Sequence, residues 1–326
     1  MKFTNDQLKM FVTGATSIKE EDGYLSFHRF SDKQTAYYHD TNLDFYGKSF
    51  ATSGVRISMT TDADEITFAF RTKKASSRHF YFVDMCVDGV LVAHEGKTDI
   101  IDDEGTMTFT IPAGTHLVEF YMPNLYSLQI KDMELIGATK AETVRKKYRM
   151  LAFGDSITQG YDALFSSLSY ANITADLLNA TLVDQAIGGE VFNPGIIDGE
   201  IDFDPDFITV AYGTNDFSKS TREVMERDAA EFYRRLREAF PNAKIFAMMP
   251  IWRKDTKDKV RVLGTFEDAK AIVRAAAEAQ PNTVVIDCDG FVPHHSDFFS
   301  DLRLHPNDIG FKFYGEALAR AIKPHL

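Results

Sequence analysis

The spacing of apolar residues changes near residue 149, and this change limits the folds that the chain can adopt. From there onward, short apolar runs alternate with amphipathic stretches. The apolar runs are 150–153, 207–211, 245–249 and 284–286, and the stretches expected to be helical are 167–179, 222–240, 267–279 and 309–322. Strands that alternate with helices form a parallel sheet with helices on both faces. The sequence therefore predicts an α/β domain over residues 148–326.

The pattern before about residue 135 is short and alternating instead. Segments 56–59, 65–70 and 106–111 indicate strands with one polar and one apolar face, and turn residues separate them. A further hairpin is expected at Val87-Asp88-Gly89-Val90. Closely spaced short strands predict a β-sandwich of jelly-roll type over residues 1–140, with no long helix beyond about the first dozen residues. The charged segment 138–147 is expected to connect the two domains.

Composition and charge exclude several classes of function. The 326 residues carry a formal net charge of −12, which argues against nucleic acids and anionic membranes as partners. The first residues contain no apolar core of signal-peptide length, and no apolar run could span a bilayer. We therefore expect a soluble cytoplasmic protein, of an oligomeric state that the sequence does not indicate.

Neither the cysteines nor the histidines indicate a structural framework or a metal centre. Cys86 and Cys288 are expected to lie in different domains, so we expect no disulfide framework. His294 and His295 are adjacent, which suits shared metal ligation poorly, and no second cluster of ligands supports them. The sequence therefore predicts no metal and no cofactor.

Three polar turns, far apart in the chain, each follow an apolar run or precede a helix. They are Gly154-Asp155-Ser156-Ile157-Thr158, Gly213-Thr214-Asn215-Asp216 and His305-Pro306-Asn307-Asp308. The carboxyl ends of parallel strands share one edge of a sheet, so we expect these turns to converge. A serine, an amide and a histidine that meet there supply a nucleophile, an oxyanion donor and a base. The pattern predicts a site for acyl transfer.

Each of these segments alone also has a purely structural explanation. Ser156 could be an ordinary capping serine, Asn215 could cap the helix after it, and Gly188-Gly189 could be a plain turn. Thr158 stands where the Gly-x-Ser-x-Gly elbow of α/β-hydrolases has its second glycine. The Gly-Lys-Ser/Thr ending of a phosphate-binding loop is also missing.

Taken together and in this order, the segments resemble the SGNH (GDSL-type) hydrolase superfamily from about residue 148 to the end. The resemblance implies a flavodoxin-like three-layer α/β/α catalytic domain, with Ser156 as the nucleophile and His305 as the base. It also implies an oxyanion hole made by the N–H groups of Ser156 and Gly189 and by the side chain of Asn215. Gly189 matches the family's glycine better than Gly188, which we place among the substrate-binding residues.

One position departs from the family pattern. The family's aspartate stands three residues before the histidine, where this chain has Leu302, and Asp301 lies one residue earlier. We expect Asp301 to reach His305 across a longer turn. The alternative is a Ser–His dyad oriented by a backbone carbonyl, as is understood for some two-domain carbohydrate esterases of the superfamily. Asp155 is placed among the substrate-binding residues, where it is expected to support the loop without reacting.

A β-sandwich in front of such a domain resembles acetyl esterases that act on plant polysaccharides such as xylan and mannan. Trp252, the only tryptophan, follows the strand 245–249, where it could form a sugar platform, close an acyl pocket or pack between the domains. The resemblance implies an esterase that removes a small acyl group from a small-molecule or oligosaccharide ester through a Ser156 acyl-enzyme, with acetyl as the leading candidate for the acyl group. Alternatives are an acyltransferase, an esterase of acylated metabolites or lipids, and a carbohydrate-binding protein without activity.

Overall fold

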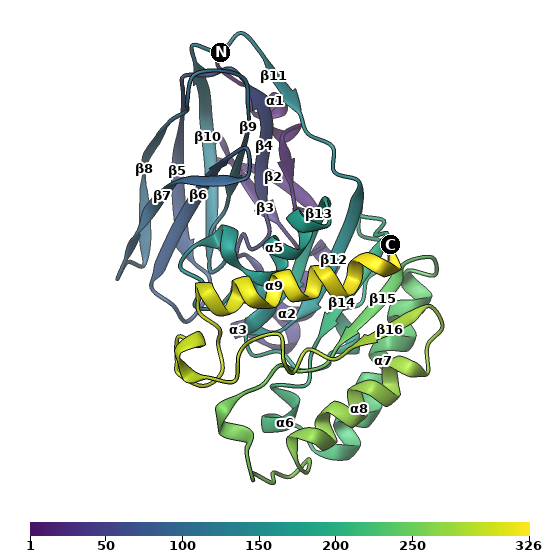
Figure 1. Cartoon of the computed structure of the whole chain (residues 1–326). Helices are drawn as coiled ribbons and strands as arrows, with labels where there is room; N and C mark the ends of the chain where they lie inside the picture. Colours follow the sequence, from purple (N-terminus) through teal and green to yellow (C-terminus); the bar gives the residue numbers. More distant parts are fainter.

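Two antiparallel sheets face each other in the N-terminal half of the computed structural model, which describes all 326 residues (Figure 1). One sheet has the order β1-β4-β9-β6-β7, with β11 also paired to β4, and the other has the order β2-β3-β10-β5-β8. The first sheet consists of β1 (Val12–Thr13), β4 (Arg56–Thr61), β6 (Phe80–Val87), β7 (Val90–Thr98), β9 (His116–Tyr121) and β11 (Ala141–Thr143). The second consists of β2 (Ser17–Glu21), β3 (Tyr24–His28), β5 (Glu65–Lys74), β8 (Asp102–Thr110) and β10 (Tyr126–Ile136), and a short helix, α1 (Asn5–Lys9), precedes both sheets.

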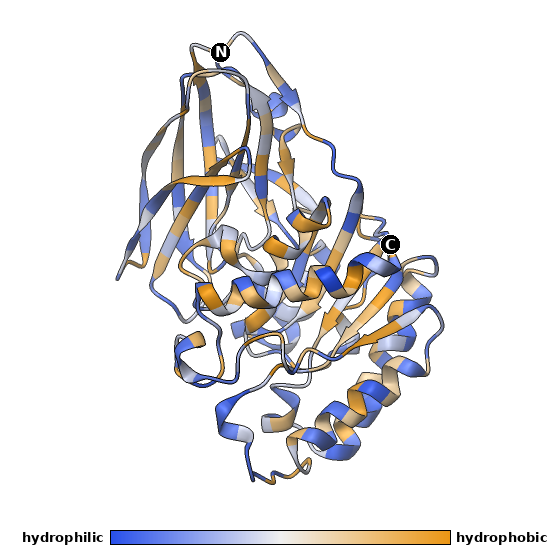
Figure 2. Ribbon diagram, in the orientation of Figure 1, coloured by the Kyte–Doolittle hydropathy of each residue, from blue (hydrophilic) through white to orange (hydrophobic).

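The sandwich forms because its strands alternate in polarity, and Figure 2 shows this alternation along the ribbon. Ile66, Phe68 and Phe70 of β5 point inward and are buried, whereas the residues between them are partly exposed. The predicted β6–β7 hairpin is present, with Asp88 and Gly89 both at positive φ, as a two-residue type I′ turn requires. The predicted β-sandwich is therefore confirmed, and the expected connecting segment contributes the edge strand β11 to it.

The prediction that this half has no long helix was wrong. Helices α2 (Asp32–Thr41) and α3 (Leu43–Ser49) lie between β3 and β4. Ser31 and Gln34 form a capping box at the start of α2, and the side chain of Asn42 caps α3. These capping signals are present in the sequence, but α2 is polar on most of its surface and lacks the wide apolar stripe by which amphipathic helices are recognised.

The helices α2 and α3 pack on the C-terminal half instead of the sandwich. Phe30 and Tyr38 belong to the buried core of the parallel sheet, and Tyr37, Phe45 and Tyr46 pack against that core. The apolar face of this insertion is therefore covered by residues more than a hundred positions later in the chain.

The C-terminal half is a parallel sheet with the order β13-β12-β14-β15-β16. Its strands are β12 (Tyr148–Gly154), β13 (Ala180–Ala186), β14 (Phe207–Ala211), β15 (Lys244–Met248) and β16 (Thr283–Ile286). Its helices are α4 (Ser156–Gln159), α5 (Tyr170–Leu177), α6 (Asp216–Lys219), α7 (Arg222–Ala239), α8 (Phe266–Glu278) and α9 (Asp308–Ile322). Short 3-10 turns occur at η1 (Ser166–Leu168), η2 (Pro194–Ile196), η3 (Lys254–Thr256), η4 (Ser296–Phe298) and η5 (Lys323–His325). The predicted three-layer α/β/α fold is confirmed.

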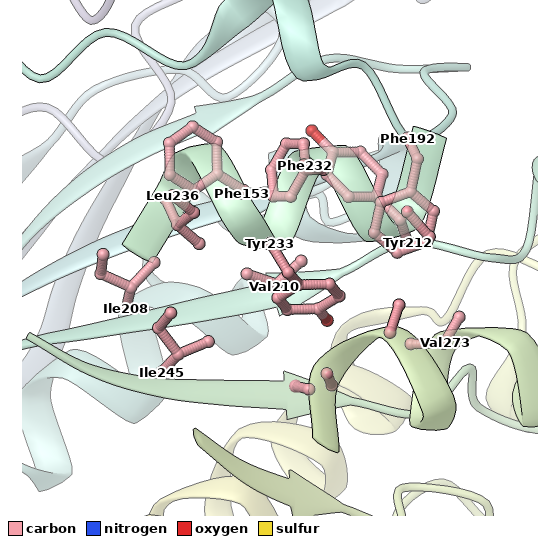
Figure 3. Packing of buried hydrophobic residues seen from close by; sticks show 14 of the residues in the cluster. Phe153, Phe192, Ile208, Val210, Tyr212, Phe232, Tyr233, Leu236, Ile245 and Val273 are labelled. Carbon is pink, nitrogen blue, oxygen red and sulfur yellow. The ribbon is translucent and has the colours of Figure 1, made fainter. Parts of the chain in front are cut away.

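Helices cover both faces of the parallel sheet. Residues of α5 and α9 bury one face, and α9 (yellow) crosses in front of the sheet in Figure 1. Residues of α7, α8 and α2 bury the other face. Figure 3 shows this second core, where Val210 and Phe153 of the sheet lie against Phe232 and Leu236 of α7. The carboxyl ends of the strands stay uncovered by these helices, and the loops that carry the polar turns begin there.

Buried polar contacts join the two halves. The guanidinium of Arg29 is fully buried, donates 2.6 Å to the carbonyl of Ala51 and also donates to the carbonyl of Asp184 on β13. Arg56 of β4 forms an ion pair with Asp176 of α5. Arg56 also donates to Oδ1 of Asn172 at 2.9 Å, so buried hydrogen bonds to directional partners fix how the halves meet. None of the helices is long and apolar enough to cross a lipid bilayer.

Candidate active site

Ser156, His305 and Asp301 form a continuous chain of hydrogen bonds at the carboxyl edge of the parallel sheet. Strand β12 ends at Gly154, the next residue caps α4, and Ser156 is the first residue of that helix. Its Oγ lies 2.9 Å from Nε2 of His305, and Nδ1 of His305 lies 3.0 Å from Oδ2 of Asp301. This is the arrangement of a serine nucleophile, a base and an acid that fixes the tautomer of the base.

The longer turn between Asp301 and His305 closes through one unusual backbone conformation. Leu302 has a φ of +60°, in the left-handed region that non-glycine residues rarely adopt. With this residue turned, Oδ1 of Asp301 accepts the N–H groups of Arg303, Leu304 and His305 at 3.1, 2.7 and 3.1 Å. Partial burial opposes ionisation of Asp301, but the hydrogen bonds from His305 and from the backbone outweigh it and hold its pKa well below the usual range.

The expected oxyanion donors gather beside Ser156. Gly189 has a φ of +93°, which favours glycine, and its N–H has no acceptor within the protein. The N–H of Ser156 is at the first position of α4, where no intrahelical acceptor exists. The amide nitrogen of Asn215 donates to Oδ2 of Asp155 at 3.2 Å and to the carbonyl of Glu190 at 3.1 Å, so its orientation is fixed from two sides.

The N–H and the carbonyl of Gly188 both have partners within the protein, and its role in substrate binding stays a prediction. Its N–H donates to Oε1 of Gln159 at 2.7 Å, and its carbonyl accepts from Nζ of Lys48 at 2.9 Å. A Cβ at this position would stand 2.5 Å from the ring of Tyr161, so only glycine fits. Because the Gly188 carbonyl and the Gly189 N–H belong to one peptide group, Lys48 holds the plane of that group.

Asp155 lies beneath the serine loop, and its assignment to the substrate-binding residues stays a prediction. Its side chain is buried, Oδ1 accepts the N–H of Ile157 at 3.0 Å, and Oδ2 accepts from Asn215. Burial raises the pKa of Asp155 to about 6. The residue supports the loop, as expected, by joining Ser156's helix to Asn215.

Two further buried carboxyl groups lie behind the oxyanion donors. Glu190 accepts hydrogen bonds from Tyr38 at 2.8 Å and from Tyr212 at 3.1 Å, and burial raises its pKa to about 8. Asp216 accepts the N–H groups of Phe192 and Gly213, both at 3.1 Å, and burial raises its pKa to about 7. These groups fix the backbone on either side of Gly189 and Asn215.

A model of the GDSL-like lipase/acylhydrolase family matches residues 152–313, which contain Ser156, Gly189, Asn215 and His305. The chain belongs to this family through its C-terminal half.

Several solved structures share the whole two-part architecture of this family member. Salicylyl-acyltransferase SsfX3 from a tetracycline biosynthetic pathway has a TM-score of 0.86 and 21% identity, over 100% of this chain and 97% of that one. A family two carbohydrate esterase from Clostridium thermocellum, in complex with cellohexaose, has a TM-score of 0.67 and 17% identity over 84% and 93%. An acetyl xylan esterase from the rumen bacterium Butyrivibrio proteoclasticus has a TM-score of 0.67 and 14% identity over 100% and 98%.

At these identities the similarity concerns the fold. The comparison with curated proteins found no sequence match.

Trp252 lies at the same sheet edge but packs within the C-terminal half, not between the halves. Its ring stacks on His294 with centroids 5.3 Å apart and contacts Phe299 at the same distance. It lines a cavity of about 660 Å³ together with Arg253, whose Nη1 donates 3.0 Å to the carbonyl of Thr214, next to Asn215. The residues that line this cavity include none of Ser156, Gly189, Asn215 and His305, and a substrate role for Trp252 stays a prediction. No group of three or more His, Cys, Asp or Glu side chains is arranged to hold a metal ion.

Sequence reasoning missed the supporting residues that come from the other half. Lys48 on α3 and Tyr38 on α2 contact the oxyanion side, and Arg78 contacts Asp162 near His305. No local pattern marks these residues, because each acts through a partner more than eighty positions away. Glu190 could have been noticed, since it follows Gly188-Gly189 directly.

Proposed function

We propose that the protein is a serine esterase that removes a small acyl group from a carbohydrate. Acetyl is the leading candidate for that acyl group. The observation that carries this proposal is the chain Ser156–His305–Asp301, with heavy-atom distances of 2.9 and 3.0 Å. Membership of the GDSL-like lipase/acylhydrolase family supports the ester chemistry. Similarity to esterases of acetylated xylan and to a carbohydrate esterase seen with cellohexaose supports the substrate class.

In the first half of the reaction, Nε2 of His305 takes the proton of Ser156 as Oγ attacks the acyl carbonyl carbon. The resulting imidazolium is stabilised by Asp301, and it then protonates the sugar oxygen as the bond between that oxygen and the acyl carbon breaks, so that the sugar leaves as an alcohol. In the second half, water attacks the Ser156 acyl-enzyme with His305 again as base, and the carboxylic acid leaves. In this scheme both proton transfers use Nε2 of His305, which lies 2.9 Å from Oγ of Ser156.

The negative charge that develops on the carbonyl oxygen meets the N–H groups of Gly189 and Ser156. Asn215 contributes by sharing one of the two hydrogen atoms that it donates to Asp155 and to the Glu190 carbonyl. Preorganised donors of this kind lower the barrier because they need no rearrangement as the charge forms.

An acyltransferase is a second candidate, favoured by the similarity to salicylyl-acyltransferase SsfX3 over nearly the full length of both chains. The same acyl-enzyme would then be attacked by an alcohol instead of water.

The test is acetate release from acetylated xylan and mannan oligosaccharides and from a small activated acetyl ester, for the wild type and Ser156→Ala. We expect the rate of acetate release by the variant to be lower than that of the wild type by a factor of about 10⁴ or more. Ser218→Ala, an exposed serine on α6, is the matched control and should retain activity. Acyl transfer to added alcohols, followed by mass spectrometry, distinguishes the second candidate. A wild type inactive on every ester, or an active Ser156→Ala, would contradict the proposal.

A further inference from the structure

His305 faces two carboxylates, not one. Its Nδ1 lies 3.0 Å from Oδ2 of Asp301 and 3.6 Å from Oδ2 of Asp162. Asp162 follows α4 and has a φ of +68°, a left-handed conformation that aspartate and asparagine tolerate better than most residues. Its side chain is only 11% exposed. The two aspartates reach the same imidazole nitrogen from opposite ends of the C-terminal half.

A residue of the sandwich fixes the second carboxylate. Arg78, in the loop before β6, donates through both Nε and Nη2 to the two carboxylate oxygens of Asp162, with Nη2 3.0 Å from Oδ2. The guanidinium also lies 5.4 Å from the centre of the Tyr161 ring. That ring in turn stacks on His305, with centroids 6.0 Å apart and planes inclined by 28°. A paired fork of this kind holds a carboxylate in one orientation.

The position of Asp162 matters most when His305 becomes positively charged. In the resting state the nearer oxygen of Asp301 accepts a hydrogen bond from Nδ1 of His305, and the carboxylate of Asp162 is hydrogen-bonded to Arg78. Once His305 has taken the serine proton, both carboxylates lie within the range at which an opposite charge favours imidazolium. The remaining charged groups around His305 are Asp155 beneath Ser156 and Arg303, whose Nε lies 3.8 Å from Asp301.

We propose that Asp162 is a second positioning residue for His305, held in place by Arg78 of the sandwich, and that it shares with Asp301 the orientation and stabilisation of the imidazolium. The proposal rests on the esterase reaction proposed above. It also makes the sandwich a supplier of part of the acid–base machinery.

The test compares Asp162→Asn, Asp301→Asn and the double variant by kcat/KM on an activated acetyl ester. Asparagine keeps the size of the side chain and tolerates the left-handed backbone at residue 162. We expect losses of about threefold for Asp162→Asn, about 100-fold for Asp301→Asn and about 10⁴-fold for the double variant, the full loss typical of a removed triad aspartate. The double loss then exceeds the product of the single losses, because either carboxylate partly replaces the other. A double variant no worse than Asp301→Asn would overturn the proposal.

A measurement that needs no turnover separates this inference from the proposed function. The pKa of His305 is followed by NMR titration, with its resonance assigned by its loss in His305→Gln. Asp162→Asn should lower that pKa by about half a unit to one unit, and an unchanged pKa would overturn the inference. Asp176→Asn is the matched control, since it breaks another Arg–Asp pair between the halves, with Arg56, away from His305. If the wild type hydrolyses none of the esters, the esterase proposal is wrong. The NMR titration of His305 still decides the role of Asp162 in that case.

Discussion

The N-terminal half reaches the active site on two sides, and the two contacts differ in kind. On the oxyanion side, Lys48 of α3 donates to the carbonyl of Gly188. On the acid–base side, the guanidinium of Arg78 donates hydrogen bonds to the carboxylate of Asp162 beside His305. The first contact acts on a neutral peptide group, whereas the second acts on a charge next to an imidazole. The comparison teaches that one N-terminal half can support two sides of a candidate active site by different physics, through orientation on one side and through charge on the other.

The oxyanion side is tested most strongly by Asn215→Ala. Loss of one preorganised donor should reduce kcat by about 10²–10³-fold. Above the pKa of about 6 of its partner Asp155, the loss should be independent of pH because the amide does not titrate, and this separates it from variants on the acid–base side. Steady-state kinetics from pH 6 to 9 and a thermal melt check the result. A loss of only a few-fold would mean that Gly189 and Ser156 carry the oxyanion without Asn215.

A smaller loss is expected for Lys48→Met, which removes the ammonium from the Gly188 carbonyl but keeps the apolar part of the side chain. The peptide group of Gly188 and Gly189 would lose both its orientation and its polarisation. We expect kcat to fall about tenfold, ~1.4 kcal/mol in the barrier, with KM little changed. Lys33→Met on α2, where the lysine faces Asp198 at 3.7 Å, is the matched control. Equal kinetics for the two variants would remove Lys48 from the oxyanion side.

Glu190→Gln tests the buried carboxyls by the pH dependence of stability. Burial raises the pKa of Glu190 from 4.5 to about 8, so between these values the folded protein keeps a proton that the unfolded chain has lost. Stability therefore falls as the pH rises through this range, by up to about 1.4 kcal/mol per pH unit for one group. The glutamine should flatten this slope in urea unfolding between pH 5 and 8. A slope equal to that of the wild type would assign the effect to other groups.

The smallest effect is expected for Leu302→Asn. Leu302 is 58% exposed and held at a φ of +60°, which asparagine adopts at lower cost. We expect a gain of about 0.5–1 kcal/mol in unfolding free energy and unchanged kcat, because Asp301 keeps its reach to His305. Chemical denaturation measures the gain. A destabilised variant would show that the leucine side chain stabilises the turn in a way that outweighs the backbone cost.

Much of the fold could be predicted, because the central strands of the parallel sheet are mostly buried and leave apolar runs such as 207–211 and 245–249. The insertion α2–α3 could not, because its buried side chains, Tyr38 among them, face a partner surface formed by the other half. The periodicity of a sequence shows which face of a helix is apolar. A mostly polar helix that packs through a few aromatic residues has an apolar face too narrow to be recognised in this way.

The convergence of Ser156, Asn215 and His305 could be predicted because each lies at or near a strand end or helix start within a recognisable block. Whether Asp301 reaches His305 depended on one φ angle, at Leu302, which no sequence pattern signals. The contacts of Asp155 and Gly188 could not be predicted for a related reason. Both residues stand next to candidate site residues in the sequence, but the direction of each side chain or N–H group is set by partners such as Asn215 and Gln159.

The docking of α2–α3 has a consequence for how the chain is made. During synthesis these helices are complete long before the residues between 180 and 236 that cover Tyr38 and its aromatic neighbours. Until then an aromatic surface stays exposed beside a sandwich whose core residues, apart from Tyr161, have all been made. A gene fragment that ends after residue 143 should therefore give an aggregation-prone product. Protein engineers who wish to exchange the front half should move residues 29–50 together with the C-terminal half.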